Sequence, residues 1–145
     1  MGLMPAPLFH LAIPAKDLQE ARNFYAGILG ASEGRSDERW VDFNFFGHQL
    51  VLHLDDSDTN FLDKVTSVVD GDLVPVPHFG VILDDNNWKT LVKRLNVAGW
   101  AYEIEPHVKF KNLPGEQWTM FIRDPSGNAL EFKHFENLDQ IFATE

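Results

Sequence analysis

Three side chains that can bind a metal ion stand inside apolar segments that are far apart in the chain. They are His10 in LFHLAI, His78 in HFGVIL and Glu131 in NALEF. Such short apolar runs predict strands, and side chains alternate between the two faces of a strand. Each of the three then shares its face with a small residue two positions away in the chain, namely Ala12, Gly80 and Ala129. A cavity lined by metal ligands requires such small residues beside the ligands.

Two imidazoles and one carboxylate form the facial triad that holds non-haem iron, and the same set can bind zinc, nickel or manganese. Burying a glutamate in an apolar strand is costly without a cation or hydrogen-bond partners, and a metal ion removes that cost. The sequence therefore predicts a divalent metal ion (Fe, Mn, Zn or Ni) held by His10, His78 and Glu131. For each histidine taken singly, the alternative is a core residue that only forms hydrogen bonds.

The elements that position these residues occur twice along the chain. In the first half, a strand at residues 8–13 is followed by a helix that Asp17 caps and Gly30 ends. Two further strands are expected at residues 40–46 and 49–54, joined at the Gly47-His48 turn.

The second half repeats this order. A strand at residues 78–83 precedes a helix that is capped by Asp85 and closed by Gly99. Further strands are expected at residues 100–105, 117–123 and 128–134, and the last two form a hairpin around the turn sequence DPSG. The similarity of HLAIP near the start to HFGVIL near the middle indicates an internal duplication.

The duplication predicts one domain made of two modules, at about residues 8–55 and about 77–135. Between them, a surface connection is expected at about residues 56–76, in which FLDKV has the pattern of a helical turn. The remaining tail, about residues 136–145, predicts a weak helix or a frayed end.

Composition excludes several classes of partner. The 12 basic and 22 acidic side chains give a formal net charge of -10, which repels nucleic acid and anionic membrane surfaces. The chain has no cysteine, so a metal ion must be held by nitrogen and oxygen ligands. No apolar run is long enough to span a membrane, and the first ten residues lack the pattern of a signal peptide. A cytoplasmic location is the resulting expectation.

The motifs together resemble the vicinal oxygen chelate superfamily, which contains glyoxalase I, fosfomycin-resistance transferases, extradiol dioxygenases and bleomycin-binding proteins. The resemblance extends from LFHLAIPAKDLQEARNFYAGILG through PHFGVIL to MFIRDPSGNALEFKHF, and DPSGNALEF is its most specific part. It implies an α+β fold of two tandem βαβββ modules, whose curved mixed sheets surround a central cavity with the helices outside. By this resemblance, His10, His78 and Glu131 match the metal-ligand positions. A second module or a second chain commonly completes such a site, so the resemblance also implies a homodimer.

The fourth ligand position departs from the resemblance. Glyoxalase I enzymes have a further glutamate in the last strand of the first module, which can act as the base. In QLVLHLDD the candidates are Val51 and His53, which share a face of the strand. Aligning Gly47 with Gly127 favours Val51 and a site with three protein ligands, whereas counting from the strand end favours His53. His53 would then act as a fourth ligand or as an acid or base.

Three further residues are candidates for substrate binding. His107 lies in the segment PHVKFKNLPGE, which is expected to be a loop that could close over the site as a lid, with Lys109 and Lys111 supplying a cation for a substrate carboxylate. Glu116 and Gln117 open the following strand and are expected to line the cavity. A solvated loop without contact to a substrate is the alternative.

The sequence thus favours a metal-dependent enzyme whose small substrate chelates the metal through neighbouring oxygens, with a slight preference for dioxygenase over glyoxalase I chemistry. The first alternative is a binding protein of the bleomycin-sequestering type, which encloses a drug or antibiotic without catalysis. The second is a duplicated scaffold whose histidines only form hydrogen bonds in the core.

Overall fold

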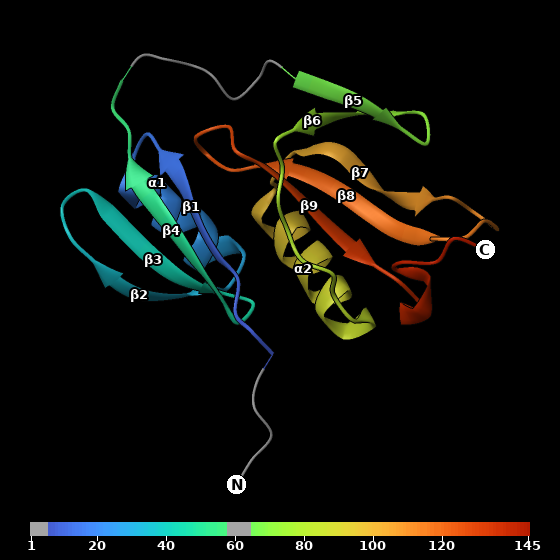
Figure 1. The fold of residues 1–145 in the computed structure, drawn as a ribbon. Helices are drawn as coiled ribbons and strands as arrows, with labels where there is room; N and C mark the ends of the chain where they lie inside the picture. The colour runs from blue at the N-terminus through green and yellow to red at the C-terminus, as the bar shows by residue number, and fades with distance from the viewer. Residues whose placement is uncertain (1–5, 58–64) are drawn as a thin grey trace, which may run out of the picture. The chain divides into compact units, whose positions relative to one another are not determined.

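Helices and strands are arranged in two units, residues 1–57 and residues 58–145 (Figure 1). The structure is a computed structural model that describes residues 6–57 and 65–145. In each unit, a helical segment packs against one face of a β-sheet, and no helix of the described residues lies on the other face. The fold is α+β with curved mixed sheets, as the sequence predicts.

The first unit contains a four-stranded sheet in the order β1-β4-β3-β2. Strand β1 runs parallel to β4, and the other pairs are antiparallel. The Asp17 carboxylate caps helix α1 by accepting the Glu20 N–H, as predicted, and α1 continues as the π-helix η1. The elements are β1 (His10–Ala15), α1 (Leu18–Arg22), η1 (Asn23–Ile28), β2 (Ser32–Ser36), β3 (Trp40–Phe45) and β4 (His48–Leu54).

Aromatic packing decides which face of this sheet is the core. Tyr25 of η1 is fully buried, and its ring centroid lies 5.6 Å from that of Phe43 and 6.2 Å from that of Phe45. Because faces alternate along a strand, the residues between these core positions point to the opposite face. On β1 and β4 that opposite face carries His10 and Gln49, which are direct neighbours in the register.

The second unit has the antiparallel sheet β7-β8-β9, and residues 79–83 extend it by pairing in parallel with β9. Helix α2 buries Trp88, Leu91 and Leu95, and it begins after an N-cap at Asp84, one residue earlier than predicted. Gly99 ends α2 in the left-handed conformation, as predicted. The elements are β5 (Val65–Val69), β6 (Asp72–Val76), α2 (Asp85–Ala98), β7 (Tyr102–Lys109), β8 (Gln117–Arg123), β9 (Ala129–His134) and η2 (Leu138–Gln140).

Residues 65–76 contain regular structure where the sequence predicted only a surface connection. They form the two-stranded hairpin β5–β6, turning at Asp70 and Gly71, both of which have positive φ. The predicted helical turn at FLDKV falls mainly on residues 61–64, which lie outside the described residues. Strand β2 is a further element that the sequence did not predict.

Strand β7 shows that the loop expected at PHVKFKNLPGE is in part a strand. It extends through Lys109, so that His107 and Lys109 belong to the sheet and pair with Thr119 and Gln117 of β8. A strand within a sheet is held by backbone hydrogen bonds on its neighbour, which a mobile lid lacks. Both side chains therefore have fixed positions on a sheet face.

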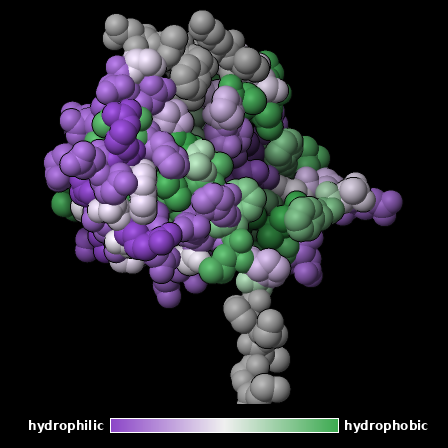
Figure 2. Space-filling view, turned by 60° about the vertical axis from the view of Figure 1, so that its left-hand side comes forward, coloured by the Kyte–Doolittle hydropathy of each residue, from purple (hydrophilic) through white to green (hydrophobic). Residues whose placement is uncertain are grey.

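The face drawn in Figure 2 has hydrophilic and hydrophobic regions. Hydrophilic residues cover most of its left-hand side, and hydrophobic residues gather towards its middle and right-hand side. In the described parts of the chain, no helix is long and apolar enough to cross a membrane.

Candidate metal centre

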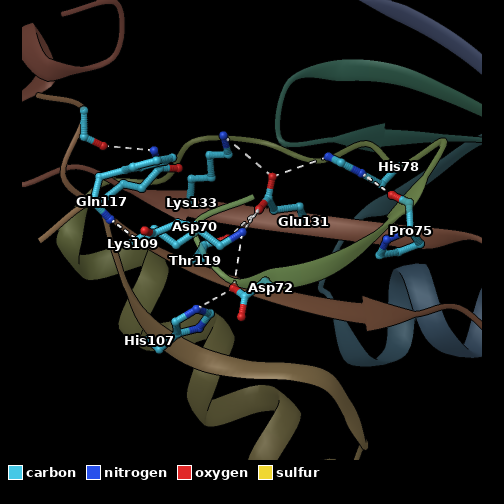
Figure 3. Close-up of polar contacts among 12 residues, drawn as sticks. Asp70, Asp72, Pro75, His78, His107, Lys109, Gln117, Thr119, Glu131 and Lys133 are labelled. Carbon is cyan, nitrogen blue, oxygen red and sulfur yellow. Dashed lines mark hydrogen bonds and ion pairs between the residues drawn. The ribbon is translucent and has the colours of Figure 1, made fainter. Parts of the chain in front are cut away.

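Glu131 lies on β9, on the sheet face opposite to the buried side chains of Leu130 and Phe132. Only 8% of the residue is exposed. Its Oε2 accepts a hydrogen bond of 2.6 Å from the buried Thr119 hydroxyl, and its Oε1 lies 3.5 Å from His78 Nε2 (Figure 3). The structure thus brings two of the three predicted metal ligands together within one unit.

The orientation of the His78 ring is set by its other nitrogen. His78 Nδ1 lies 2.6 Å from the Pro75 carbonyl oxygen, which can only accept, so Nδ1 carries the proton. The ring also packs edge-on against Phe121, with centroids 4.9 Å apart. In the neutral imidazole, the Nε2 lone pair therefore faces Glu131.

The spacing of the two donor atoms fits a shared metal ion. Ligand atoms about 2.1 Å from a tetrahedral zinc ion are about 3.4 Å apart. The observed 3.5 Å between His78 Nε2 and Glu131 Oε1 matches this value. A carbonyl that accepts from the remote nitrogen of a histidine is also the usual support of a histidine that binds a metal.

Two ammonium groups lie close to the Glu131 carboxylate. Lys133 Nζ is 3.6 Å from Oε1, and Lys109 Nζ is 3.9 Å from Oε2. Lys109 is only 2% exposed, and its Nζ also lies 3.4 Å from Asp72 of the β5–β6 hairpin. The buried ammonium is thus compensated by the Glu131 and Asp72 carboxylates. Asp72 Oδ2 also lies 2.7 Å from His107 Nε2.

The His78–Glu131 pair shifts the pKa values of both partners. The hydrogen bond with Glu131 raises the pKa of His78 above its ordinary value, although burial acts in the opposite direction. Burial would raise the pKa of Glu131, but hydrogen bonds with His78 and Thr119, together with the nearby ammonium groups, hold that pKa below its ordinary value. The metal-free pair is thus favoured as imidazolium and carboxylate.

A pH dependence of stability follows for the metal-free protein. The pKa of His78 is raised in the folded protein. Its contribution to stability is therefore complete below the pKa of the unfolded state, 6.5, and is lost as the pH rises through the pKa of the folded state. Because the pKa of Glu131 is lowered, its contribution is present above 4.5 and is lost as the pH falls through the folded value. We therefore expect the free energy of unfolding, measured with urea in the presence of chelator, to differ most between wild type and His78→Gln at about pH 5 to 6.5. At about pH 8.5 the difference should be smaller. An unchanged difference across this range would contradict the ion pair.

His10, the third predicted ligand, lies in the first unit on the helix-free face of its sheet. Its Nδ1 lies 2.9 Å from Gln49 Oε1, and the residue is exposed. An amide oxygen only accepts, so Nδ1 donates and Nε2 is left with its lone pair. In their neutral forms, His10 and His78 thus have the same tautomer, with the same nitrogen available to a metal ion.

The register of the two sheets favours Val51 at the fourth position. Gly80 is the direct neighbour of Glu131, since Phe79 pairs with Leu130 in parallel. The equivalent of Gly80 in the first unit, two residues after its histidine, is Ala12, and Ala12 pairs with Val51. His53 lies two residues further along β4 and is exposed. The position equivalent to Glu131 therefore carries an apolar side chain.

The three residues predicted to bind substrate have other contacts in the structure. His107 Nδ1 donates to the Glu105 carbonyl, and its Nε2 contacts Asp72. Glu116 accepts from the Asn112 N–H, and Gln117 donates to the Gly115 carbonyl. Glu116 and Gln117 line a cavity of about 410 Å³ together with Trp118 and His134, whose lining does not include His78, Glu131 or Lys109.

Within each unit, the described residues contain no group of three histidine, aspartate or glutamate side chains that could hold a metal ion. Sequence reasoning missed the contacts of Thr119, Lys133 and Asp72 around Glu131, and those of Asp42 and Gln49 near His10. Asp42 had a readable signal, because it interrupts the apolar strand WVDFNF as Glu131 interrupts NALEF.

The comparisons with known proteins agree with this architecture. The sequence profile of the glyoxalase/bleomycin resistance protein/dioxygenase superfamily matches residues 8–132, and the chain belongs to this superfamily. None of the curated proteins matches the sequence. A glyoxalase/bleomycin resistance protein/dioxygenase from Alicyclobacillus acidocaldarius is 34% identical, with a TM-score of 0.77, over 94% of this chain and 96% of that chain.

Two more distant structures share the fold. The fosfomycin resistance protein FosX from Listeria monocytogenes is 15% identical, with a TM-score of 0.69, over 96% of this chain and all (100%) of that chain. A lactoylglutathione lyase from Agrobacterium tumefaciens is 22% identical, with a TM-score of 0.60, over 90% of this chain and 96% of that chain. A fosfomycin resistance protein and a lactoylglutathione lyase thus share this fold with the chain.

Proposed function

We propose that the protein is a metal-dependent enzyme in which His10, His78 and Glu131 hold a divalent cation. The observation that carries the proposal is the common geometry of the two histidines: each places Nδ1 against an oxygen acceptor, so that Nε2 is the nitrogen left for a bond to the metal. The two histidines come from equivalent positions of the duplicated modules. In this superfamily, a second module or a second chain commonly completes the metal site. This supports a homodimer as the active form.

The substrate that we propose is a small molecule with neighbouring oxygens, at least one of them anionic. Lys109 and Lys133 support this choice, because a cation at Glu131 would leave both ammonium groups less compensated by that carboxylate. Their positions favour binding of an anionic substrate oxygen next to Glu131. When bound, the metal would supply a Lewis acid for an enolate or catecholate, or a binding platform for dioxygen.

Dioxygenase chemistry is the form that we favour over isomerisation of a hemithioacetal. The position equivalent to Glu131 in the first unit carries Val51, which cannot act as a base. The exposed His53 lies two residues beyond this position on β4. Glyoxalase I chemistry needs a glutamate that transfers the substrate proton. This position therefore lacks the carboxylate that would do so.

Purified protein tests the proposal directly. Prepared without added metal, it should contain iron, manganese, zinc or nickel by elemental analysis, and it should lose thermal stability in chelator. A metal at 100 times its Kd stabilises by about 2.7 kcal/mol, which should raise Tm by about 5 to 10 °C. Protein without metal, and without a response to added metal, would refute the proposed site.

Activity assays then separate the reaction classes. The metal-loaded enzyme should consume oxygen with catechols and should have no lyase activity on methylglyoxal with glutathione. The alternative is a drug-binding resistance protein, which the shared fold with FosX favours. It predicts instead that an antibiotic such as fosfomycin or bleomycin raises Tm in the presence of chelator.

A further inference from the structure

A chain of hydrogen bonds crosses the helix-free face of the first unit and ends at His10. The Arg35 backbone N–H donates to Asp42 Oδ1, and Gln49 Nε2 donates to Asp42 Oδ2 at 3.3 Å. Gln49 Oε1 in turn lies 2.9 Å from His10 Nδ1. The strands that carry these residues are neighbours, since β4 lies between β1 and β3.

The direction of each bond in this chain follows from Asp42. A carboxylate accepts only, so the side of the Gln49 amide that faces Asp42 must be its NH₂ group. The amide oxygen then faces His10, and the imidazole can meet it only as a donor. Without Asp42, the Gln49 amide could rotate by half a turn and present its NH₂ group to Nδ1, which would favour the other tautomer of His10.

Asp42 is itself held firmly. Its exposed fraction is 7%, and its Oδ1 receives the Arg35 N–H from strand β2. The close approach of β2 depends on Gly34, because a Cβ at that residue would lie 2.3 Å from Asp42 Oδ1. The backbone thus anchors one end of the chain of hydrogen bonds, and the histidine stands at the other end.

The neighbouring His48 shows that this tautomer is not general on the sheet. His48 Nδ1 lies 3.0 Å from the Phe9 backbone nitrogen, which can only donate, so this nitrogen accepts and Nε2 carries the proton. His10, His48, Asp42 and Gln49 line the same pocket of about 390 Å³. Within that pocket, only His10 of these two histidines presents an Nε2 lone pair.

We propose that Asp42 and Gln49 are positioning residues that hold His10 in the Nδ1–H tautomer and so prepare its Nε2 to bind the divalent cation. This inference rests on the proposed function, and it adds the residues that prepare the ligand. His78 needs no such residues, because the Pro75 carbonyl serves the same purpose. Loss of an outer partner of this kind typically weakens metal binding by about 10-fold to 100-fold.

The test uses metal-free protein labelled with ¹⁵N. Long-range ¹H–¹⁵N correlation at about pH 8 reports which ring nitrogen carries the proton in a neutral imidazole. Wild type should show His10 protonated on Nδ1. Gln49→Leu should shift His10 towards the Nε2–H form that free imidazole side chains prefer, while His78 keeps its spectrum. The affinity for Mn²⁺ or Ni²⁺ should fall about 10-fold to 100-fold.

A double variant provides the rescue. In Asp42→Asn combined with Gln49→Glu, the new amide at position 42 donates to the new carboxylate at position 49, which still accepts from His10. The tautomer and the metal affinity should return towards wild type, whereas Asp42→Asn alone should impair both. Gln19→Leu, an exposed change of the same type on α1, is the matched control and should alter neither.

The outcomes separate the two proposals. Wild-type His10 protonated on Nε2, or a Gln49→Leu variant with unchanged tautomer, would overturn the positioning role whatever the metal does. Wild type with the Nδ1–H tautomer but no affinity for Mn²⁺ or Ni²⁺ would support the hydrogen-bond chain and would refute the metal site. Thermal melts of each variant establish that the comparison is made on folded protein.

Discussion

Glu131→Gln is expected to weaken metal binding by more than about 100-fold, because a ligand contributes more than the outer contacts whose loss costs about 10-fold to 100-fold. The substitution keeps the shape of the side chain and still offers an oxygen to the Thr119 hydroxyl. It removes the charge that attracts a cation and that compensates Lys109 and Lys133. Titration calorimetry with Mn²⁺ or Ni²⁺ measures the change.

Two sets of variants complete this experiment. His10→Ala and His78→Ala should each cause a loss of similar size, and combining them should add little because the site acts as a unit. Glu136→Gln, an exposed change of the same type just beyond β9, should bind metal as wild type does. Wild-type affinity in Glu131→Gln, with an unchanged melting profile, would remove this glutamate from the site.

The elements that the sequence predicted well are those with local signals. Asp17 and Gly99 cap helices in the structure as they were expected to do, because a cap depends on residues within one turn. The hairpin around DPSG is also local, and β8 and β9 lie on either side of it as expected. The strand bounds at these places consequently agree closely with the prediction.

The β5–β6 hairpin was missed although its signal was present. Asp70-Gly71 between VV and DLV is a hairpin sequence, since both central residues of such a turn need positive φ. The acidic surroundings favoured an irregular connection instead. The error matters for the site, because this hairpin carries Asp72, which contacts the buried Lys109.

The contacts of the candidate ligands were harder to foresee because they depend on register. Sequence alternation places Gln49 on a face, but only the pairing of β1 with β4 puts it beside His10. The choice between Val51 and His53 likewise needed the pairing of Ala12. A shift of one residue in a parallel pair would have given a different neighbour with the same sequence pattern.

Gly80→Ala should destabilise the protein by about 3 kcal/mol or more, since a Cβ at this residue would lie 1.5 Å from the Glu131 carbonyl oxygen. The clash is with the backbone, so residues 79–83 must separate from β9, and Glu131 must move with respect to His78. At the equivalent position of the first unit, Ala12 pairs with Val51, so a methyl group is accommodated there.

Urea unfolding of Gly80→Ala and of a matched variant measures this effect. Gly27→Ala is the control, because nothing lies within 4 Å of a Cβ built there and its φ is not positive. Without a clash, alanine in a helical segment should be neutral or stabilising by up to about 1 kcal/mol. If both variants unfolded at the same urea concentration as wild type, the close pairing of residues 79–83 with β9 would be wrong. The placement of His78 beside Glu131 would then be wrong as well, because that pairing holds the histidine against the sheet.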